Sequence, residues 1–289
     1  MDIMDRQALG KQFTRTYGGD RDGWKRVTEY RQVQKYTAEH PNQGSAAVSS
    51  AVNLPRGRIR PWIENDGCPD PVRGLQTCED HGWLDLDWLE LPFTGLNSLV
   101  AWIFSGGSID REGFVPQFTI QSAADYDRLD AAFDAIGIGM EVLRETDPKR
   151  ATEAKPSTAA SALGRLLHVL GAPVGAKNPM SDVSLPTYLD EAPYPDRLTF
   201  ARIYLANRKT TRPDRPNTPV QFREERSPAY RRELIAFLTD VVGSEGAIRG
   251  GSEVLRLNQR ATALLCPEIY QPEPIGDCSQ NDKNRSIDE

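Results

Sequence analysis

The stretch that decides the fold runs from Leu96 to Ile109 and reads LNSLVAWIFSGGSI. Its first ten residues are mostly apolar and predict a helix. Gly106 and Gly107 then break this helix, because glycine is a poor helix former. The residues that follow predict a strand, so we expect an apolar helix that leads directly into a sheet.

The region around this helix occurs twice in similar form. The strand expected at 115–122 and the helix at 123–136 parallel a second strand at 219–224 and a second helix at 228–242, and Phe118 and Phe222 lie 104 residues apart. An apolar helix precedes each strand, and a further strand region and helix follow it. These flanking segments are 96–105, 139–146 and 157–170 in the first copy and 197–207, 246–258 and 259–265 in the second. The repeated order predicts an α+β pseudo-dimer within one chain.

The first helix and the segment between the two copies resemble the LAGLIDADG homing endonucleases. Gly107-Ser108-Ile109 match the closing Gly-Ser-Ile of the family's signature helix, and Ala101 matches its small packing position. The segment from Ala162 to Leu189 contains an apolar helix, a Gly-x-Pro-x-Gly-x-Lys turn ending at Lys177, and a Leu-Pro strand, as between the family's repeats. The resemblance implies two signature helices packed at a pseudo-twofold axis and a saddle of two sheets that binds double-stranded DNA.

The acids that hold metal ions in this family are missing from the alignment. The first falls on Gly106, and the second falls on or near Ala206, followed by Asn207. Divalent cations that activate water for phosphodiester attack need carboxylate oxygens. Asp110 is the nearest substitute, but we expect it on the following strand, pointing away from the axis. We therefore predict no catalytic residue, no metal and no cofactor.

The N-terminal third predicts an all-α helix-turn-helix domain over residues 24–82. Two short helices, at 44–52 and 56–63, are joined by a tight turn, and Pro55 occupies a position at the start of the second where no backbone donor is lost. Longer helices are expected before and after them, at 24–39 and 71–81. We expect residues 1–23 to be flexible, 83–94 to form an apolar hinge, 95–266 to form the two-repeat domain, and 267–289 to be disordered.

Charge gives mixed indications about a nucleic-acid partner. The 289 residues include 35 basic and 41 acidic side chains, a net charge of −6 that argues against a protein that wraps nucleic acid. Between Trp24 and Glu64, however, seven basic residues face three acidic ones. No apolar run approaches the roughly 18 residues of a membrane span, and no signal peptide is apparent, which predicts a cytoplasmic protein without a membrane partner.

Polar residues in both parts of the chain are candidates for DNA contact, because amides can pair with adenine and arginines with guanine in the major groove. Exposed basic turns and solvated sheet faces without a partner remain alternatives for the same residues. The candidates are Arg56, Arg58, Arg60 and Ser49 in the helix-turn-helix, and Gln117, Thr119, Gln121, Gln221 and Arg223 on the sheets.

These observations predict a sequence-specific DNA-binding protein, a transcriptional regulator built on a catalytically inactive endonuclease fold. It is similar in kind to bacterial regulators of sporulation and division that combine a degenerate LAGLIDADG domain with a helix-turn-helix, although their order of domains is reversed. An active or nicking homing endonuclease is the first alternative. A protein-interaction scaffold that does not bind DNA is the second, and the acidic balance favours it. The oligomeric state stays open.

Overall fold

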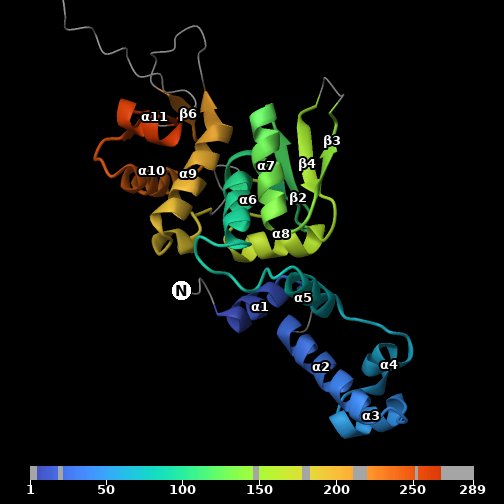
Figure 1. Cartoon of the computed structure of the whole chain (residues 1–289). Helices are drawn as coiled ribbons and strands as arrows, with labels where there is room; N and C mark the ends of the chain where they lie inside the picture. The colour runs from blue at the N-terminus through green and yellow to red at the C-terminus, as the bar shows by residue number, and fades with distance from the viewer. Residues whose placement is uncertain are drawn as a thin grey trace, which may run out of the picture.

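The computed structural model describes residues 5–18, 22–145, 150–177, 183–210, 220–250 and 253–267. Within these residues, helices combine with two antiparallel four-stranded sheets, which confirms the predicted α+β class (Figure 1). The prediction of disorder for 268–289 lies outside the described residues. No helix in the described part of the chain is both long and apolar enough to cross a membrane.

The two sheets belong to two copies of one sequence of elements. The first copy contains α6 (Phe93–Gly106), β1 (Gly107–Ile109), β2 (Pro116–Ile120), α7 (Ala123–Ala135), β3 (Met140–Leu143), β4 (Thr152–Pro156) and α8 (Ala160–Val169). The second contains α9 (Tyr194–Arg208), β5 (Lys209–Thr210), β6 (Gln221–Arg223), α10 (Pro228–Val242), β7 (Ile248–Gly250), β8 (Val254–Leu257) and α11 (Gln259–Leu265), after a short 3-10 helix at Thr187–Asp190. The strand orders β1-β2-β4-β3 and β5-β6-β8-β7 are equivalent.

Helices α6 and α9 pack against each other between the two copies and pass straight into the edge strands β1 and β5. Ala101 and Ala201 are completely buried, as small residues in closely packed helices should be. On another face of α6, a Cβ atom on Gly95 would lie 2.7 Å from the Ala132 carbonyl oxygen of α7, so only glycine fits there. The apolar composition of 96–105 thus reflects a helix with neighbours on several sides.

Among the described residues before the repeats there are five helices: α1 (Arg6–Arg15), α2 (Gly23–Glu39), α3 (Ser45–Val52), α4 (Arg56–Glu64) and α5 (Asp70–Asp80). Figure 1 shows α1 and α5 beneath the repeats, while α2 runs away from them toward α3 and α4 at the far end. The distal part has a small core of its own, made of Val33, Val48, Val52 and Ile59.

The N-terminal segment differs from the flexible stretch that we expected over residues 1–23. Residues 6–15 form α1, in which Leu9 and Phe13 are completely buried in the main core. Asp5 caps this helix by accepting a hydrogen bond from the Ala8 amide at 2.9 Å. The sequence of this segment looks polar because these two apolar residues are surrounded by polar ones. Their spacing of four residues nevertheless places both on one face of a helix.

The segment expected to be a hinge holds the helical part against the repeats. Trp83 is completely buried, and its indole Nε1 donates to the Ile136 carbonyl at 2.8 Å. A second connection runs through Arg165 of α8, whose guanidinium lies 4.0 Å from the Tyr17 ring and 4.1 Å from the Phe114 ring. Helices α1 and α5 therefore share the core of the repeats, and only α2–α4 extend beyond it.

Candidate functional site

The candidate site lies where α6 and α9 end side by side, between the edge strands of the two sheets. Ser105 and Asn207 meet there, and the Asn207 amide donates to the Ser105 hydroxyl at 2.9 Å. A Cβ atom on Gly106 would lie 3.3 Å from the Cβ of Asn207. We call this place the seam, and define it by Ser105, Gly106, Asn207 and Arg208.

The strand register corrects the sequence alignment of the second repeat. Gly107 pairs with Phe118 in the first sheet, and Lys209 pairs with Phe222 in the second. Because Phe118 and Phe222 are equivalent, Lys209 is the counterpart of Gly107, and Arg208 is the counterpart of Gly106. The alignment had indicated a position on or near Ala206, which lies two residues before Arg208. Strand pairing, which the sequence alone does not reveal, fixes where the helix ends and the strand begins.

Asp110 does not reach the seam. It follows β1 directly and accepts hydrogen bonds from the backbone amides of Glu112, Gly113 and Val115 at 3.0, 2.6 and 2.7 Å. Burial is the largest single influence on the pKa of its carboxyl group and raises it, but the backbone hydrogen bonds together outweigh burial and bring that pKa below its usual value. Its oxygens are thus committed to shaping the turn between β1 and β2.

Cationic side chains occupy the end of α6. The Lys177 ammonium donates to the carbonyl oxygens of Ile103 and Gly107, and the Arg226 guanidinium donates to that of Phe104. A helix leaves its last carbonyls without internal partners and carries partial negative charge at its C-terminus, so cations stabilise this end. Lys177 comes from the loop after α8, and Arg226 from the loop after β6.

Lys177 is poorly solvated and repelled by its neighbours. Burial is the main cause that lowers its pKa, to about 7, and the charges of Arg226 and Arg208 lower it further, while Glu224 opposes them. Near neutral pH its ammonium is therefore only partly protonated. Lys177 is the titratable group of the site whose charge responds to small changes near pH 7.

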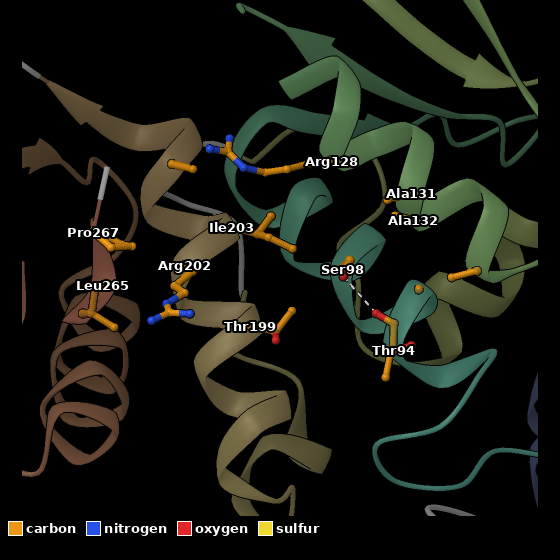
Figure 2. Close-up of a pocket in the computed structure, with 13 residues that line it drawn as sticks. Thr94, Ser98, Arg128, Ala131, Ala132, Thr199, Arg202, Ile203, Leu265 and Pro267 are labelled. Carbon is orange, nitrogen blue, oxygen red and sulfur yellow. Dashed lines mark hydrogen bonds between the residues drawn. The ribbon is translucent and has the colours of Figure 1, made fainter. Parts of the chain in front are cut away.

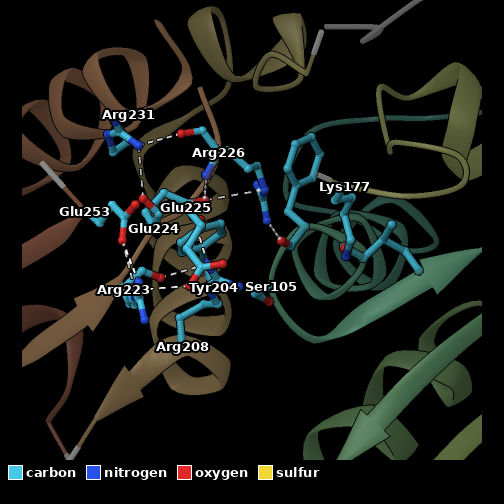
Figure 3. Close-up of polar contacts among 12 residues, drawn as sticks. Ser105, Lys177, Tyr204, Arg208, Arg223, Glu224, Glu225, Arg226, Arg231 and Glu253 are labelled. Atoms are coloured by element: carbon cyan, nitrogen blue, oxygen red, sulfur yellow. Dashed lines mark hydrogen bonds and ion pairs between the residues drawn. The ribbon is translucent and has the colours of Figure 1, made fainter. Parts of the chain in front are cut away.

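Glu224 balances part of this positive charge. It is completely buried and lies 3.2 Å from Arg208 and 3.5 Å from Arg226, measured between carboxylate oxygens and guanidinium nitrogens. The Tyr204 hydroxyl and the Arg226 backbone amide also donate to this carboxylate (Figure 3). Its oxygens are thus occupied by donors of the protein itself.

These groups line a polar pocket of about 480 Å³. Four of its ten lining side chains are basic and two are acidic, which gives a net charge of +2 when Lys177 is protonated. The lining residues are Ser105, Gln121, Lys177, Asn207, Arg208, Thr210, Arg223, Glu224, Glu225 and Arg226.

This donor set does not fit the metal ions that the family resemblance would imply. Mg²⁺ and Ca²⁺ require several oxygen ligands, and guanidinium and ammonium groups repel them. At the seam, the two positions equivalent to the family's metal-binding acids are occupied by Gly106 and Arg208. The buried Glu224 already accepts hydrogen bonds from Tyr204, Arg208 and Arg226. Across the described residues, no three His, Cys, Asp or Glu side chains are grouped so that they could hold a metal.

The predicted DNA-contacting residues of α3 and α4 are largely engaged within the protein. Arg58 points into the bundle, where it pairs with Glu29 at 2.7 Å and is 22% exposed. Arg60 is exposed and pairs with Glu64 at 2.7 Å, and Arg56 is exposed and donates to Ser45 at 3.1 Å. Ser49 donates to the Leu54 carbonyl at 2.6 Å, which closes the turn between the helices.

The sheet residues that we predicted to contact DNA differ in their exposure, and the two sheets that carry them differ in charge. Gln117, Thr119 and Gln221 are half-buried, whereas Gln121 and Arg223 are exposed. The structure brings Gln121 and Arg223 together in the seam pocket, although Arg223 also pairs with Glu253 at 2.7 Å. In the first sheet, acids and bases alternate: Glu141 is paired with Lys155 in register, and Glu153 lies 2.6 Å from Arg144.

The second sheet carries a row of polar and basic side chains, which we call the basic row, that we did not predict from the sequence. Gln221, Arg256 and Arg249 lie opposite one another on β6, β8 and β7. Both arginines are exposed. The alternation of buried Leu255 and Leu257 around Arg256 is a signal that could have identified the outward-facing position.

A second pocket lies between α6, α7 and α9 and has a different character. It is a groove of about 490 Å³ whose walls include Ala132, Ile203 and Leu265, with Arg128 and Arg202 also among its lining residues (Figure 2). Ala206, on or near which the alignment placed the second acid, lines this groove and is not among the residues that line the seam pocket. The lining of this groove contains two arginines, Arg128 and Arg202, and no cluster of charged side chains comparable to that of the seam pocket.

No family model matches this chain, and no curated protein matches it either.

Proposed function

We propose that this chain is a double-stranded-DNA-binding protein that does not cleave its target. It combines an inactive pseudo-dimer resembling the LAGLIDADG endonucleases, formed by α6–α11, with an N-terminal helix-turn-helix formed by α3 and α4. In this proposal its role is transcriptional regulation, and the protein acts without metal or cofactor.

The observation that carries the proposal is the replacement of acids by cations at the seam. Arg208 occupies the position equivalent to Gly106, and Lys177 and Arg226 lie at the end of the same helix pair. Nucleases of this type need carboxylates to hold the metal ions that activate water and neutralise the transition state. A cationic seam instead attracts phosphates without a means of activating water, which favours binding over cleavage.

The basic row on the second sheet supports the same conclusion. Arg249 and Arg256 are exposed and adjacent, and Gln221 lies in line with them. Arginine and glutamine on an outward sheet face have the chemistry for reading base edges, and arginine also contacts phosphates. Their position on the repeat domain favours this domain over α4 as the principal DNA contact.

A gel-shift and nicking experiment tests the proposal. The full chain is incubated with a library of duplex fragments and with supercoiled plasmid, in magnesium and in EDTA. We expect retarded duplex and intact plasmid. Each arginine contact is worth roughly 1–3 kcal/mol, so the double substitution Arg249→Gln/Arg256→Gln should weaken binding about thirtyfold or more. Cut plasmid would support the endonuclease alternative and reject the proposal.

A protein-interaction scaffold is the second candidate, and the pairing of Arg58 with Glu29 and of Arg60 with Glu64 favours it. These ion pairs neutralise two of the arginines of α4 that the helix-turn-helix hypothesis assigns to DNA contact. Failure of the chain to retard any duplex at low salt would favour the scaffold over the DNA-binding protein.

A further inference from the structure

The seam pocket contains more hydrogen-bond donors than the described residues accept. The Nε of Arg208 and the Nη1 of Arg226 are buried, and neither meets an acceptor in hydrogen-bond geometry among the described residues, although Tyr230 lies against the Arg226 guanidinium. The Arg226 side chain is only 4% exposed, so solvent does not replace the missing acceptor. Buried charged donors without acceptors are costly, which makes them strong indications of a ligand site.

Capping of helix ends explains only part of this cluster. An ammonium has three N–H groups, and Lys177 uses two of them on the carbonyls of Ile103 and Gly107. Arg208 belongs to the other helix, and its Nη2 reaches the Arg223 carbonyl at 2.8 Å and Glu224 at 3.2 Å. The remaining donors of Lys177 and Arg208 adjoin the same pocket, where Asn207 and Thr210 add neutral polar groups.

We propose that the seam pocket is a phosphate-binding site in which Arg208, Lys177 and Arg226 are the donors. A phosphate group offers the several acceptor oxygens that these donors lack, and arginine recognises its geometry well. The phosphate can belong to a DNA backbone or to a small phosphorylated molecule, and a pocket of this size accommodates either. For a phosphate that belongs to DNA, this inference rests on the proposed function, because the pocket lies between the sheets that would face the duplex.

The site couples binding to protonation. The groups that face Lys177 are the guanidinium groups of Arg226 and Arg208, the carboxylate of Glu224, and the two α6 carbonyls. A bound phosphate favours the charged form and raises the Lys177 pKa from about 7. Phosphate binding at pH 8 therefore takes up a proton, and affinity falls as the pH rises from 7.5 to 8.5, a range in which inorganic phosphate is already mostly the dianion.

The test uses the full chain and inorganic phosphate as the probe. Thermal unfolding and titration calorimetry are compared in sodium phosphate and in sodium chloride at equal ionic strength. We expect phosphate alone to raise Tm, with proton uptake at pH 8 in buffers of different ionisation enthalpy. Arg208→Gln should weaken phosphate binding at least tenfold, and Lys177→Gln should abolish the proton uptake.

Arg73→Gln is the matched control, because Arg73 is an exposed arginine on α5, outside the pocket. It should bind phosphate like the unaltered chain. Equal stabilisation of the unaltered chain by phosphate and chloride, or unchanged phosphate affinity in Arg208→Gln, would overturn the inference and leave the cations as helix caps. Phosphate also stabilises proteins in general by being excluded from their surface. A saturable heat of binding in the calorimetric titration of the unaltered chain is therefore the readout that decides the matter if Arg208→Gln fails to fold.

A fluorescent duplex separates the two sources of phosphate. Competition between phosphate and duplex, together with weaker duplex binding by Arg208→Gln, supports the DNA form. Phosphate binding without duplex binding supports a small phosphorylated ligand and rejects the proposed function. Duplex binding that is insensitive to Arg208→Gln and to phosphate keeps the proposed function and overturns the inference.

Discussion

At the scale of single residues, the seam is governed by the competition between burial and charge. Lys177 and Arg226 stabilise the carbonyl end of α6, yet they repel each other and Arg208, and one buried carboxylate, Glu224, offsets them only in part. The sequence allowed us to predict that carboxylates would be missing, because Gly106 is visible in the motif. It did not allow us to predict which side chains replace them, since Lys177, Arg208 and Arg226 come from separate segments.

The lowered pKa of Lys177 predicts a specific dependence of stability on pH. Its pKa is about 7 in the folded chain, whereas that of an ordinary lysine is 10.5, so between these values the unfolded state binds more protons and stability rises with pH. From pH 7 to pH 9 the unaltered chain should gain roughly 2 kcal/mol relative to Lys177→Met. Urea unfolding of both proteins at the two pH values measures this difference. Parallel pH dependences would show that Lys177 is charged throughout.

At the scale of elements, close backbone contacts fix the helices around the sheets. Gly164 of α8 is the clearest case, because a Cβ atom there would lie 1.8 Å from the Phe114 carbonyl oxygen. The helices with regular apolar spacing were predicted closely from sequence: α10 and α11 begin and end where expected, at Pro228–Val242 and Gln259–Leu265. Helix α1 was not predicted from the sequence, since its two core residues, Leu9 and Phe13, are surrounded by polar ones.

Two glycine substitutions should therefore have opposite effects. Gly164→Ala forces backbone to move and should destabilise the fold by about 2–4 kcal/mol. Gly57→Ala, on an exposed turn of α4 with no heavy atom within 4 Å of the added Cβ, should stabilise it by roughly 0.5–1 kcal/mol through helix propensity. Chemical denaturation of both variants provides the comparison. A neutral Gly164→Ala would mean that α8 does not approach residue 114 as described.

At the scale of the whole molecule, the N-terminal helices are fastened to the repeats by a few contacts. Arg165 lies between the rings of Tyr17 and Phe114 and donates to the Thr16 backbone carbonyl. The sequence indicated two parts with a hinge between them, but the buried Trp83 and Arg165 join α1 and α5 to the core of the repeats. Such long-range contacts join residues about 50 to 150 positions apart and leave no local pattern in the sequence.

Removing the Arg165 contact should loosen the N-terminus selectively. Arg165→Ala should cost about 2–3 kcal/mol, since it loses two cation–π contacts and a partly buried hydrogen bond. Amide exchange in α1 should increase more than in α10. Arg15→Ala, an exposed arginine of α1, is the control and should stay within about 0.5 kcal/mol of the unaltered chain. Equal increases in α1 and α10 would indicate general destabilisation instead.

The central claim is that protein cations at the seam take the place of metal ions, so that DNA is bound and left intact. The most direct measurement is the affinity for duplex DNA in EDTA and in magnesium at matched ionic strength, with supercoiled plasmid present as a cleavage reporter. We predict equal affinity in both conditions and plasmid that stays supercoiled. Binding that requires magnesium, or plasmid that becomes nicked or linear only when magnesium is present, would contradict the claim.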